Sequence, residues 1–430
     1  MSLEQAREEV AYAHGLQAYL WGYPLYRYCR SLTQALKADT FGLNTLRRYT
    51  SVDGSPAAND VTIEAKAAYD VSHEPVVVHV PHLDEPRWYL VQIGDTFDEL
   101  IANVGGAKGP RPGDYVITGP DFAGRLPAEM THLQSRTKMG IITVQIFVGG
   151  EDDLPAAIEA QRGFHVMRLS TLLRDGLGHH DGRPAPVREP ALRGPADLLY
   201  FELLGHALQS YLPAFPDSSD ALVSTFRAIG LTTGDGFDWR DLDPTTLRGL
   251  SRAAATGEQI VDQTWEGCAE LTNGWRYVLA GGRTSHDLAL RAALAKYALG
   301  SELPSELLAP TAHIDHADEA LTGEHNYVLE LAAGQLPPVS MFWNLALYDD
   351  NMHFVDNDLR RHSIGSTTPG LRREADGSIR ILIQHEPPDA LANWLPSPTR
   401  NFSVTMRLYG PQTPLLDGTY RLPAIRRHVS

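Results

Sequence analysis

The spacing of apolar residues changes three times along this chain of 430 residues, and that change limits its fold more than any single motif. Apolar residues recur at helical spacing near the N-terminus and then alternate as in strands. They return to helical spacing between about residues 195 and 300 and alternate again after about residue 310. Helices and strands that occupy separate regions are typical of an α+β protein rather than of repeated βαβ units.

The first region carries a helix start signal and then an interruption. Ser2 followed by Gln5 has the spacing of a capping box. Apolar residues follow helical spacing on both sides of Gly22 and Pro24. Because proline removes a backbone donor and clashes with the preceding turn, we expect a kink or break there, and therefore a helical hairpin in residues 1–45.

The stretch from residue 337 to 370 is the most informative part of the second β-rich region. A polar turn at residues 349–351 separates two predicted strands, and a loop rich in Asn, Asp, Arg, His and Ser follows. The apolar residues that alternate onto one face of the first strand are Met341, Trp343, Leu345 and Leu347. This pattern predicts the edge of a β-sandwich beside a cleft.

Charge and composition exclude several classes of protein. The 37 Lys and Arg residues against 53 Asp and Glu residues give a net charge of −16, which argues against nucleic acid as a partner. No run of about 18 apolar residues predicts a membrane span, and the start lacks the profile of a secretory signal. Cys29 and Cys268 have no CxxC or CxxH neighbour, so we expect free thiols and a cytoplasmic protein.

Motifs in both halves are similar to those of a large, mainly microbial family. The C-terminal half contains LPPVSMFWNLALYD, FVDNDLRRHSIG and DGSIRILIQHEPP, and the N-terminal half contains WGYP, SPAANDV and RWYLVQIGD. The chain resembles proteins made of domains of unknown function 1254 (N-terminal) and 1214 (C-terminal). Two departures stand out: the residues after Asn59-Asp60, and Gln145, where the family usually has Arg.

The resemblance implies two jelly-roll-like antiparallel β-sandwiches with a helical segment between them, and often a homo-oligomer. We expect the helices in residues 1–45, the first sandwich in residues 46–170, the mainly helical segment in residues 171–310 and the second sandwich in residues 311–430. The resemblance implies no particular reaction.

Asn59 and Asp60 form the most interesting polar pair of the N-terminal half. A carboxylate held beside an amide at the start of a sheet is able to act as a general base or to hold a substrate hydroxyl. The same pair would equally form an Asx turn that organises its loop through local hydrogen bonds. The sequence leaves both interpretations open.

A second group of candidates comes from the C-terminal half. Arg360 could clamp an anion while Asn357 orders its loop, or an Arg–Asp bridge could lock that loop onto the sandwich. His385 could titrate near neutral pH or cap a strand. The predicted catalytic residues are Asp60, His385 and Tyr348. The predicted substrate-binding residues are Asn59, Tyr23, Tyr26, Trp343, Asn357, Arg360, Ser363 and Trp394.

The tyrosines near Pro24 have two explanations. Tyr23 and Tyr26 could form an aromatic wall of a ligand cavity, since tyrosine combines apolar area with a hydroxyl. A helix that packs its aromatic residues onto a sheet predicts the same density of tyrosines, and the residue types favour that packing.

The run from His313 to Asp318 contains residue types that bind divalent transition metals. Polar residues are also expected in a hairpin turn without any ion, and we favour the turn. We therefore expect no metal and no organic cofactor.

These patterns favour an enzyme that acts on a small, partly apolar organic molecule. Acid/base chemistry in a cleft between the two β-domains would allow hydrolysis, elimination or isomerisation, and the residues do not separate these reactions. A non-catalytic carbohydrate- or metabolite-binding protein is the alternative, because fold does not dictate function. A structural or assembly protein is a third.

Overall fold

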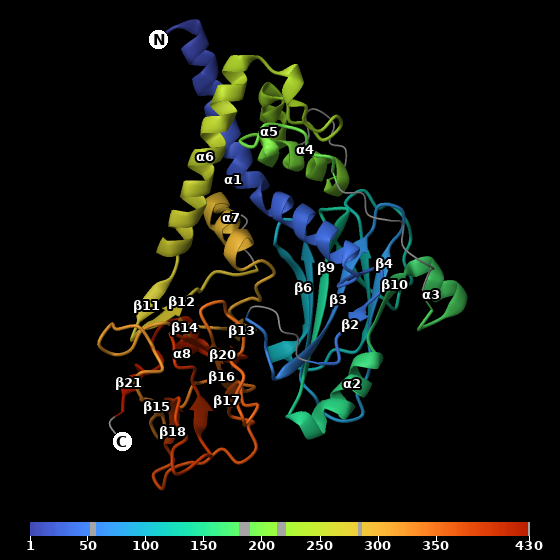
Figure 1. Cartoon of the computed structure of the whole chain (residues 1–430). Helices are drawn as coiled ribbons and strands as arrows, with labels where there is room; N and C mark the ends of the chain where they lie inside the picture. Colours follow the sequence, from blue (N-terminus) through green and yellow to red (C-terminus); the bar gives the residue numbers. More distant parts are fainter. Residues whose placement is uncertain (52–56, 180–189, 213–220, 283–285, 429–430) are drawn as a thin grey trace.

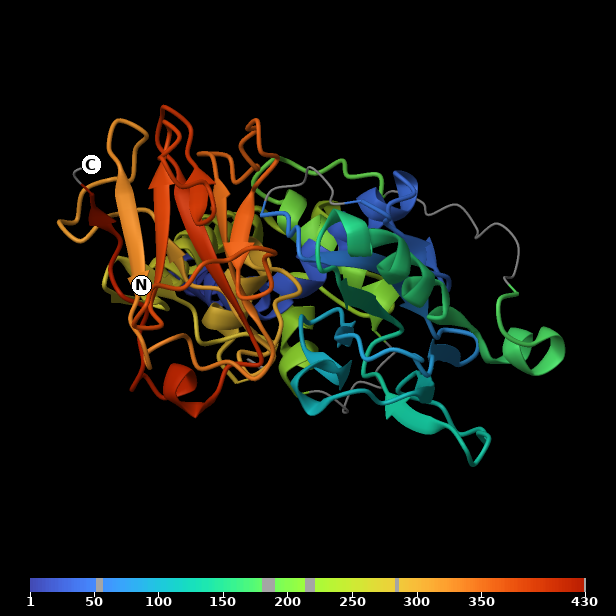
Figure 2. The ribbon, with the colours of Figure 1, turned by 90° about the horizontal axis from the view of Figure 1, so that it is seen from below.

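The structure is a computed structural model that describes residues 1–51, 57–179, 190–212, 221–282 and 286–428. It is an α+β protein in which two β-sandwiches lie side by side and a layer of helices covers one end of both (Figures 1 and 2). None of the helices in the described ranges has the length and apolar character needed to cross a lipid bilayer.

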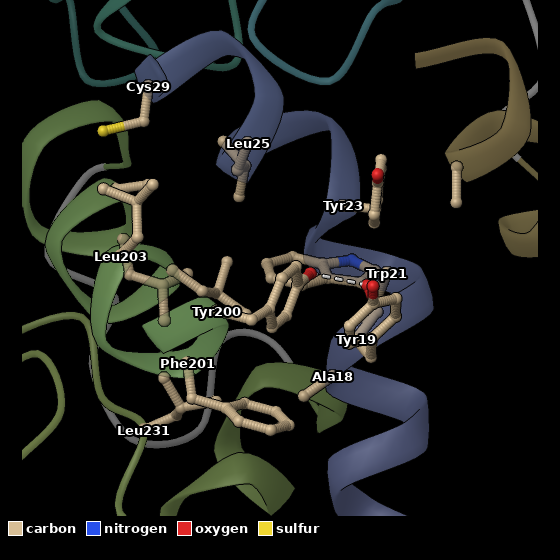
Figure 3. Packing of buried hydrophobic residues seen from close by; sticks show 14 of the residues in the cluster. Ala18, Tyr19, Trp21, Tyr23, Leu25, Cys29, Tyr200, Phe201, Leu203 and Leu231 are labelled. Carbon is tan, nitrogen blue, oxygen red and sulfur yellow. Dashed lines mark hydrogen bonds between the residues drawn. The ribbon is translucent and has the colours of Figure 1, made fainter. Parts of the chain in front are cut away.

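The N-terminal region is one helix, α1 (Leu3–Lys37), and not the expected hairpin. Ser2 and Gln5 form the predicted capping box, with the Gln5 amide 3.1 Å from the Ser2 hydroxyl. The helix changes direction between Trp21 and Leu25 but continues through Pro24 (Figures 1 and 3). Proline therefore kinks the helix as predicted, and packing on both sides keeps the two halves in one element.

The first sandwich consists of two sheets around a core of aliphatic side chains. The first sheet has the strand order β1-β3-β9-β5-β6, with β2 paired to β3, and the second has the order β10-β4-β7-β8. The strands of the first sheet are β1 (Gly42–Leu43), β2 (Arg47–Arg48), β3 (Thr62–Asp70), β5 (Tyr89–Asp95), β6 (Leu100–Gly105) and β9 (Met139–Phe147). Those of the second sheet are β4 (Val76–Val80), β7 (Gly113–Thr118), β8 (Thr131–Gln134) and β10 (His165–Arg168).

The second sandwich also begins with strands that precede residue 311. The hairpin β11 (Glu270–Thr272) and β12 (Trp275–Tyr277) starts a sheet that continues as β14-β20-β16-β17, with β13 paired to β20. The other strands of this sheet are β13 (Leu307–Leu308), β14 (Thr311–Ala312), β16 (Trp343–Tyr348), β17 (Ser363–Gly365) and β20 (Ser403–Tyr409). The facing sheet consists of β15 (Tyr327–Leu331), β18 (Ile379–Gln384), β19 (Trp394–Pro396) and β21 (Arg426–Arg427).

The helical layer joins α1 to helices from the middle of the chain in one apolar core. Tyr19 on α1 stacks on Tyr200 of α4 with the ring centroids 4.0 Å apart, and the Tyr200 hydroxyl donates to the Tyr19 carbonyl (Figure 3). The longer helices of this layer are α4 (Leu199–Tyr211), α6 (Pro244–Gly267) and α7 (Leu288–Tyr297). Shorter ones in the same layer are α5 (Ala221–Thr225) and the 3₁₀ turns η3 (Phe226–Ile229) and η4 (Trp239–Asp241). Those elsewhere are α2 (Leu154–Arg162), α3 (Leu169–Asp175), α8 (Thr413–Leu416), η1 (Gly106–Lys108) and η2 (Glu151–Asp153).

Candidate functional site

The two sandwiches meet through the outer faces of their larger sheets. In β20 the residues Val404, Met406 and Leu408 point into the core of the second sandwich. Successive strand residues point to opposite faces. Arg407 and Tyr409 are therefore on the outer face, where they contact residues from the N-terminal half.

Arg407 and Tyr348 hold the segment that precedes β3. The Arg407 guanidinium donates to the Tyr348 hydroxyl over 2.6 Å and to the Ala57 carbonyl over 2.7 Å. The Tyr348 hydroxyl donates to the Ala58 carbonyl over 2.6 Å. Burial raises the pKa of Tyr348, although the neighbouring Arg407 opposes this shift. Tyr348 is thus a buried contact between the sandwiches, and its predicted catalytic role remains a prediction.

Asn59 and Asp60 are brought to this seam. The Asn59 side chain accepts from the Val61 amide, as in an Asx turn, and donates to the Tyr409 hydroxyl over 2.6 Å. Asp60 accepts a hydrogen bond of 2.7 Å from Ser363 on β17. Burial raises the pKa of Asp60, while the Ser363 hydrogen bond and the charge of Arg407 lower it. The Asx-turn interpretation is therefore confirmed for Asn59, and the catalytic role of Asp60 remains a prediction.

Aromatic rings close the seam beside this polar group. Phe342 lies 4.7 Å from Phe147 and 4.2 Å from Tyr409, measured between ring centroids. Trp88 packs edge-on against Tyr409 at 5.1 Å. Since Trp88 and Phe147 belong to the first sandwich and the other two rings to the second, these contacts bind the sandwiches together.

A short linker crosses the outer face of the first sheet, between α7 and the second sandwich. We call residues 298–302 the connecting segment. The Gln92 amide donates to the carbonyls of Gly300 and Ser301 over 3.1 and 3.2 Å. Gln145 donates to the Glu302 carboxylate over 2.7 Å. The polar residues that alternate outward along β5 and β9 therefore anchor the connecting segment.

A cavity of about 320 Å³ lies between this sheet face, the C-terminal half of α1 and the connecting segment. We call it the α1 cavity. Its sheet wall contains Glu64 and Lys66, whose charged groups lie 2.5 Å apart. Its other polar wall residues are Tyr28, Ser31, Gln92, Asp98, Glu99, Thr143, Gln145, Ser301 and Glu302. Its apolar wall residues include Leu32, Ala35, Phe41, Ile141 and Leu299.

Two carboxyl groups of the α1 cavity have raised pKa values. Asp98, in the turn after β5, accepts from the Tyr28 hydroxyl over 2.8 Å and from the Gly300 amide over 2.9 Å. Burial raises the pKa of Asp98 to about 6, and these hydrogen bonds oppose the shift. Burial also raises the pKa of Glu302, which the hydrogen bond from Gln145 opposes and the charge of Glu64 increases.

A second cavity, of about 510 Å³, lies on the other side of the connecting segment. We call it the β12 cavity because Arg276 of β12 lines it. Ser301 and Glu302 line both cavities. The connecting segment thus separates two adjacent hollows along the seam.

The remaining predicted site residues do not join this group. Trp343, predicted to bind substrate, is instead buried in the core of the second sandwich. Trp343 and Tyr348 are five positions apart on one strand, so they point to opposite faces. Asn357 is bonded to Val355 and Arg361 of its own loop, and Arg360 is exposed.

His385, Trp394 and the two tyrosines of α1 also lie elsewhere. His385 is exposed, and its Nδ1 atom is 2.9 Å from the Ser397 carbonyl. The Trp394 indole donates to the Gln384 carbonyl. Tyr23 packs in the helical core near Tyr200 (Figure 3), whereas Tyr26 lines a separate cavity of about 660 Å³ between α1 and α4.

The run from His313 to Asp318 forms a turn. Asp315 accepts from the amides of Ala317 and Glu319 and pairs with Arg427 over 2.8 Å. His313 instead lines the β12 cavity. Among the residues that the structure describes, no three His, Cys, Asp or Glu side chains are grouped so that they could hold a metal ion.

Asp98, Glu302 and Arg407 are site residues that the sequence analysis missed. Arg407 had a detectable signal, because it alternates with Thr405 and Tyr409 on the face opposite the apolar Val404, Met406 and Leu408. Asp98 and Glu302 had none, since a turn and a linker carry no periodic pattern.

Two family models match the chain. One is described as "Protein of unknown function (DUF1254)" and covers residues 43–168, and the other as "Protein of unknown function (DUF1214)" and covers residues 306–413. The chain belongs to the two-domain DUF1254–DUF1214 family. Both groups that meet at the seam, Asn59-Asp60 and Tyr348-Ser363, lie within the matched regions.

A solved structure supports the fold. The VPA0106 protein from Vibrio parahaemolyticus is 21% identical, with a TM-score of 0.78 over 97% of this chain and 100% of that chain. An uncharacterized protein from Burkholderia cenocepacia is 11% identical, with a TM-score of 0.45 over 99% and 95% of the two chains. No curated protein matches this DUF1254–DUF1214 chain.

Proposed function

We propose that this protein is an enzyme that acts on a small, partly apolar organic molecule by acid/base chemistry in the α1 cavity, beside the seam of the two β-domains. The observation that carries the proposal is that Asp98 and Glu302 line one cavity and that burial raises the pKa of both. Carboxyl groups with pKa values moved toward neutrality are suited to proton transfer near pH 7.

The two carboxyl groups have complementary roles in this proposal. One is ionised and removes a proton from the substrate, and the other is protonated and returns one. The residues that line the α1 cavity, all of them described, include no histidine and no cysteine, so the carboxyl groups are the main candidates for chemistry there. Isomerisation, elimination and hydrolysis all fit such a pair, because carboxyl groups transfer protons and also serve as nucleophiles.

The lining also indicates the kind of substrate. Gln92, Thr143 and Ser31 offer hydrogen bonds to a polar end, while Leu32 and Phe41 offer apolar surface. The volume of about 320 Å³ is near the lower limit of known small-molecule sites, which begin at about 300 Å³. A small molecule with one polar and one apolar end matches this lining.

Deuterium exchange over a panel of compounds tests the proposal without a named substrate. The purified protein is incubated in D₂O with small hydroxy acids, unsaturated acids and ketones, and mass spectrometry detects incorporated deuterium or new products. We expect Asp98→Asn and Glu302→Gln each to lower the rate at least ~100-fold. Glu330→Gln, which changes an exposed carboxyl on β15, is the matched control and keeps the rate.

Full exchange activity in both cavity variants would contradict the proposal. Melting temperatures close to that of the wild type would show that the loss in the variants is not due to unfolding. Compounds that bind in the α1 cavity without exchange or product would instead favour the second candidate, a metabolite-binding protein. The amides of Gln92 and Gln145 in the cavity wall favour that candidate, because amides suit recognition of a polar ligand.

We also propose a cytoplasmic protein that forms a homo-oligomer. Cys29 and Cys268 are both free thiols, as expected for a reducing compartment. Light scattering on the purified protein tests the oligomer, and a mass equal to one chain of 47.3 kDa would contradict it.

A further inference from the structure

The β12 cavity has a different character from the α1 cavity. It lies between the outer face of β12 and β14, the last turn of α6 and the connecting segment, and its volume is about 510 Å³. Its residues are all in the described part of the chain. They are Trp265, Glu266, Arg276, Val278, Ala280, Ala298, Ser301, Glu302, Pro304, Leu307, Ala309, Thr311, His313 and Met352.

Among the described residues that line this cavity, Arg276 is the only arginine or lysine. Its guanidinium lies 4.2 Å from the centroid of the Trp265 ring and donates to the Trp265 carbonyl. It also lies in hydrogen-bond contact with the Cys268 thiol, forms no ion pair with a carboxylate of the described residues, and is partly buried. Because a guanidinium carries five N–H donors, several remain for a ligand.

A second arginine near the same hairpin has its charge neutralised by a carboxylate and serves as a comparison for Arg276. Arg421 lies 4.8 Å over the ring of Tyr277, but it also binds both carboxylate oxygens of Glu270 over 2.7 and 2.5 Å. The two arginines therefore share an aromatic contact near β12 and differ in charge compensation. Arg276 faces a cavity where Arg421 faces a carboxylate.

His313 lies near Arg276 in the same wall. Burial and the positive charge of Arg276 both lower the pKa of His313, so the imidazole is neutral at pH 7. A neutral imidazole still donates one hydrogen bond. An anion next to Arg276 would gain this second donor.

The rest of the lining suits an apolar body with a single charge. Val278, Ala280, Leu307 and Ala309 supply aliphatic surface. Glu266 and Glu302 are also in the wall and would repel each negative charge of a ligand, so a dianion would be repelled more than a monoanion that Arg276 neutralises. A monoanion is therefore favoured over a dianion such as a phosphate ester.

We propose that the β12 cavity is a binding site for a small organic monocarboxylate with an apolar body. The carboxylate pairs with the guanidinium of Arg276 in the fork-like geometry that this side chain favours, and the apolar body lies against the aliphatic wall. This site shares Ser301 and Glu302 with the α1 cavity, but the proposed carboxylate contact with Arg276 does not depend on the function proposed there.

Calorimetric titration of the full chain with hexanoate tests the proposal. We expect hexanoate to bind. Hexanamide, which has the same shape but no charge, should bind at least ~10-fold more weakly. Arg276→Gln is expected to weaken hexanoate binding at least ~10-fold, and Arg421→Gln, the matched control, to leave it unchanged. The proposal would be overturned by equal binding of hexanoate and hexanamide, or by an equal loss of hexanoate binding in both variants. It would also be overturned if hexanoate did not bind at ~10 mM, which corresponds to a binding free energy of about −3 kcal/mol.

A second variant tests the site even if the Arg276→Gln protein does not fold correctly. Arg276 also contacts the last turn of α6, so its replacement could unfold the helix end. Ala280→Phe keeps Arg276 and fills the aliphatic side of the cavity. We expect it to abolish hexanoate binding, whereas retained affinity in a folded Ala280→Phe protein would place the ligand elsewhere.

Discussion

At the scale of single residues, the charged groups of the seam and the α1 cavity differ in whether a charged or a neutral partner faces them. Lys66 is paired with Glu64, and Arg407 is bonded to a hydroxyl and a carbonyl. Asp98 and Glu302 accept hydrogen bonds only from neutral donors of the described residues, and burial therefore dominates their pKa values. Neutral donors reduce the cost of a buried carboxylate without removing it. That difference makes these two groups the candidates for proton transfer.

Stability should depend on pH through Asp98. Its pKa is about 6 in the folded state against an ordinary value of 3.8, so the folded state binds more protons between these values. Stability from this group is fully present below pH ~4 and is lost as pH rises through 6. Asp98→Asn keeps an oxygen that accepts from Tyr28 and Gly300 and removes the titration.

Urea unfolding at pH 4 and pH 8 measures this effect. Between pH 4 and pH 8, the free energy of unfolding of Asp98→Asn should increase relative to that of the wild type by roughly 2–3 kcal/mol. This figure follows from a shift of about two pKa units at about 1.36 kcal/mol each. Unfolding curves that move in parallel for the two proteins would contradict the raised pKa of Asp98.

At the scale of elements, strand alternation was the part of the fold that the sequence predicted best. It predicted the inward positions Trp343, Leu345 and Leu347 of β16, which all point into the core, but Met341, predicted on the same face, precedes the strand and is exposed. The single helix through Pro24 was not predictable, since tertiary packing on α4 and α6 decides it. Asp60 and Ser363 are 303 residues apart in sequence, so only the family resemblance suggested that both belong to a shared polar region.

The contact between α1 and α6 depends on glycine. A Cβ atom on Gly249 would lie 2.6 Å from the Glu8 carbonyl of α1, which is backbone and moves little. Gly249→Ala should therefore destabilise the protein by ~1–3 kcal/mol, although alanine is the better helix former. Gly267, at the end of the same helix, has no atom within 4 Å of such a Cβ.

Thermal unfolding of the two variants separates close packing from helix propensity. Gly267→Ala is expected to change the melting temperature little or to raise it. A Gly249→Ala protein as stable as the wild type would mean that the two helices separate more easily than their contact indicates.

At the scale of the whole molecule, the aromatic seam couples the sandwiches. Phe342 contacts Trp88 and Phe147 of the first sandwich, while Phe402 lies within the core of the second. Removal of either ring should cost about 3–5 kcal/mol. Only Phe342→Ala should split calorimetric unfolding into two transitions, because it removes contacts between the sandwiches. One transition in both variants would show that the coupling lies elsewhere.

The position of the connecting segment explains why the site was only partly predictable. Its residues lie between sandwiches that the sequence analysis identified, but their place over β5 and β9 follows from single hydrogen bonds such as that from Gln145 to Glu302. Gln145 stands where the family resemblance implies an arginine. In the structure this neutral side chain contacts Glu302 where an arginine would place a cation, and the raised pKa of Glu302 agrees with that difference.

The most direct test of the proposed acid/base site is a carbon-13 NMR titration of the side-chain carboxyl groups, with Asp98→Asn and Glu302→Gln used to assign the two resonances. We predict that Asp98 titrates at about 6 and that Glu302 titrates above its ordinary value of 4.5. In Gln145→Arg the pKa of Glu302 should fall, because a cation then faces the carboxylate. Titration of both groups at or below their ordinary values in the wild type would contradict the account.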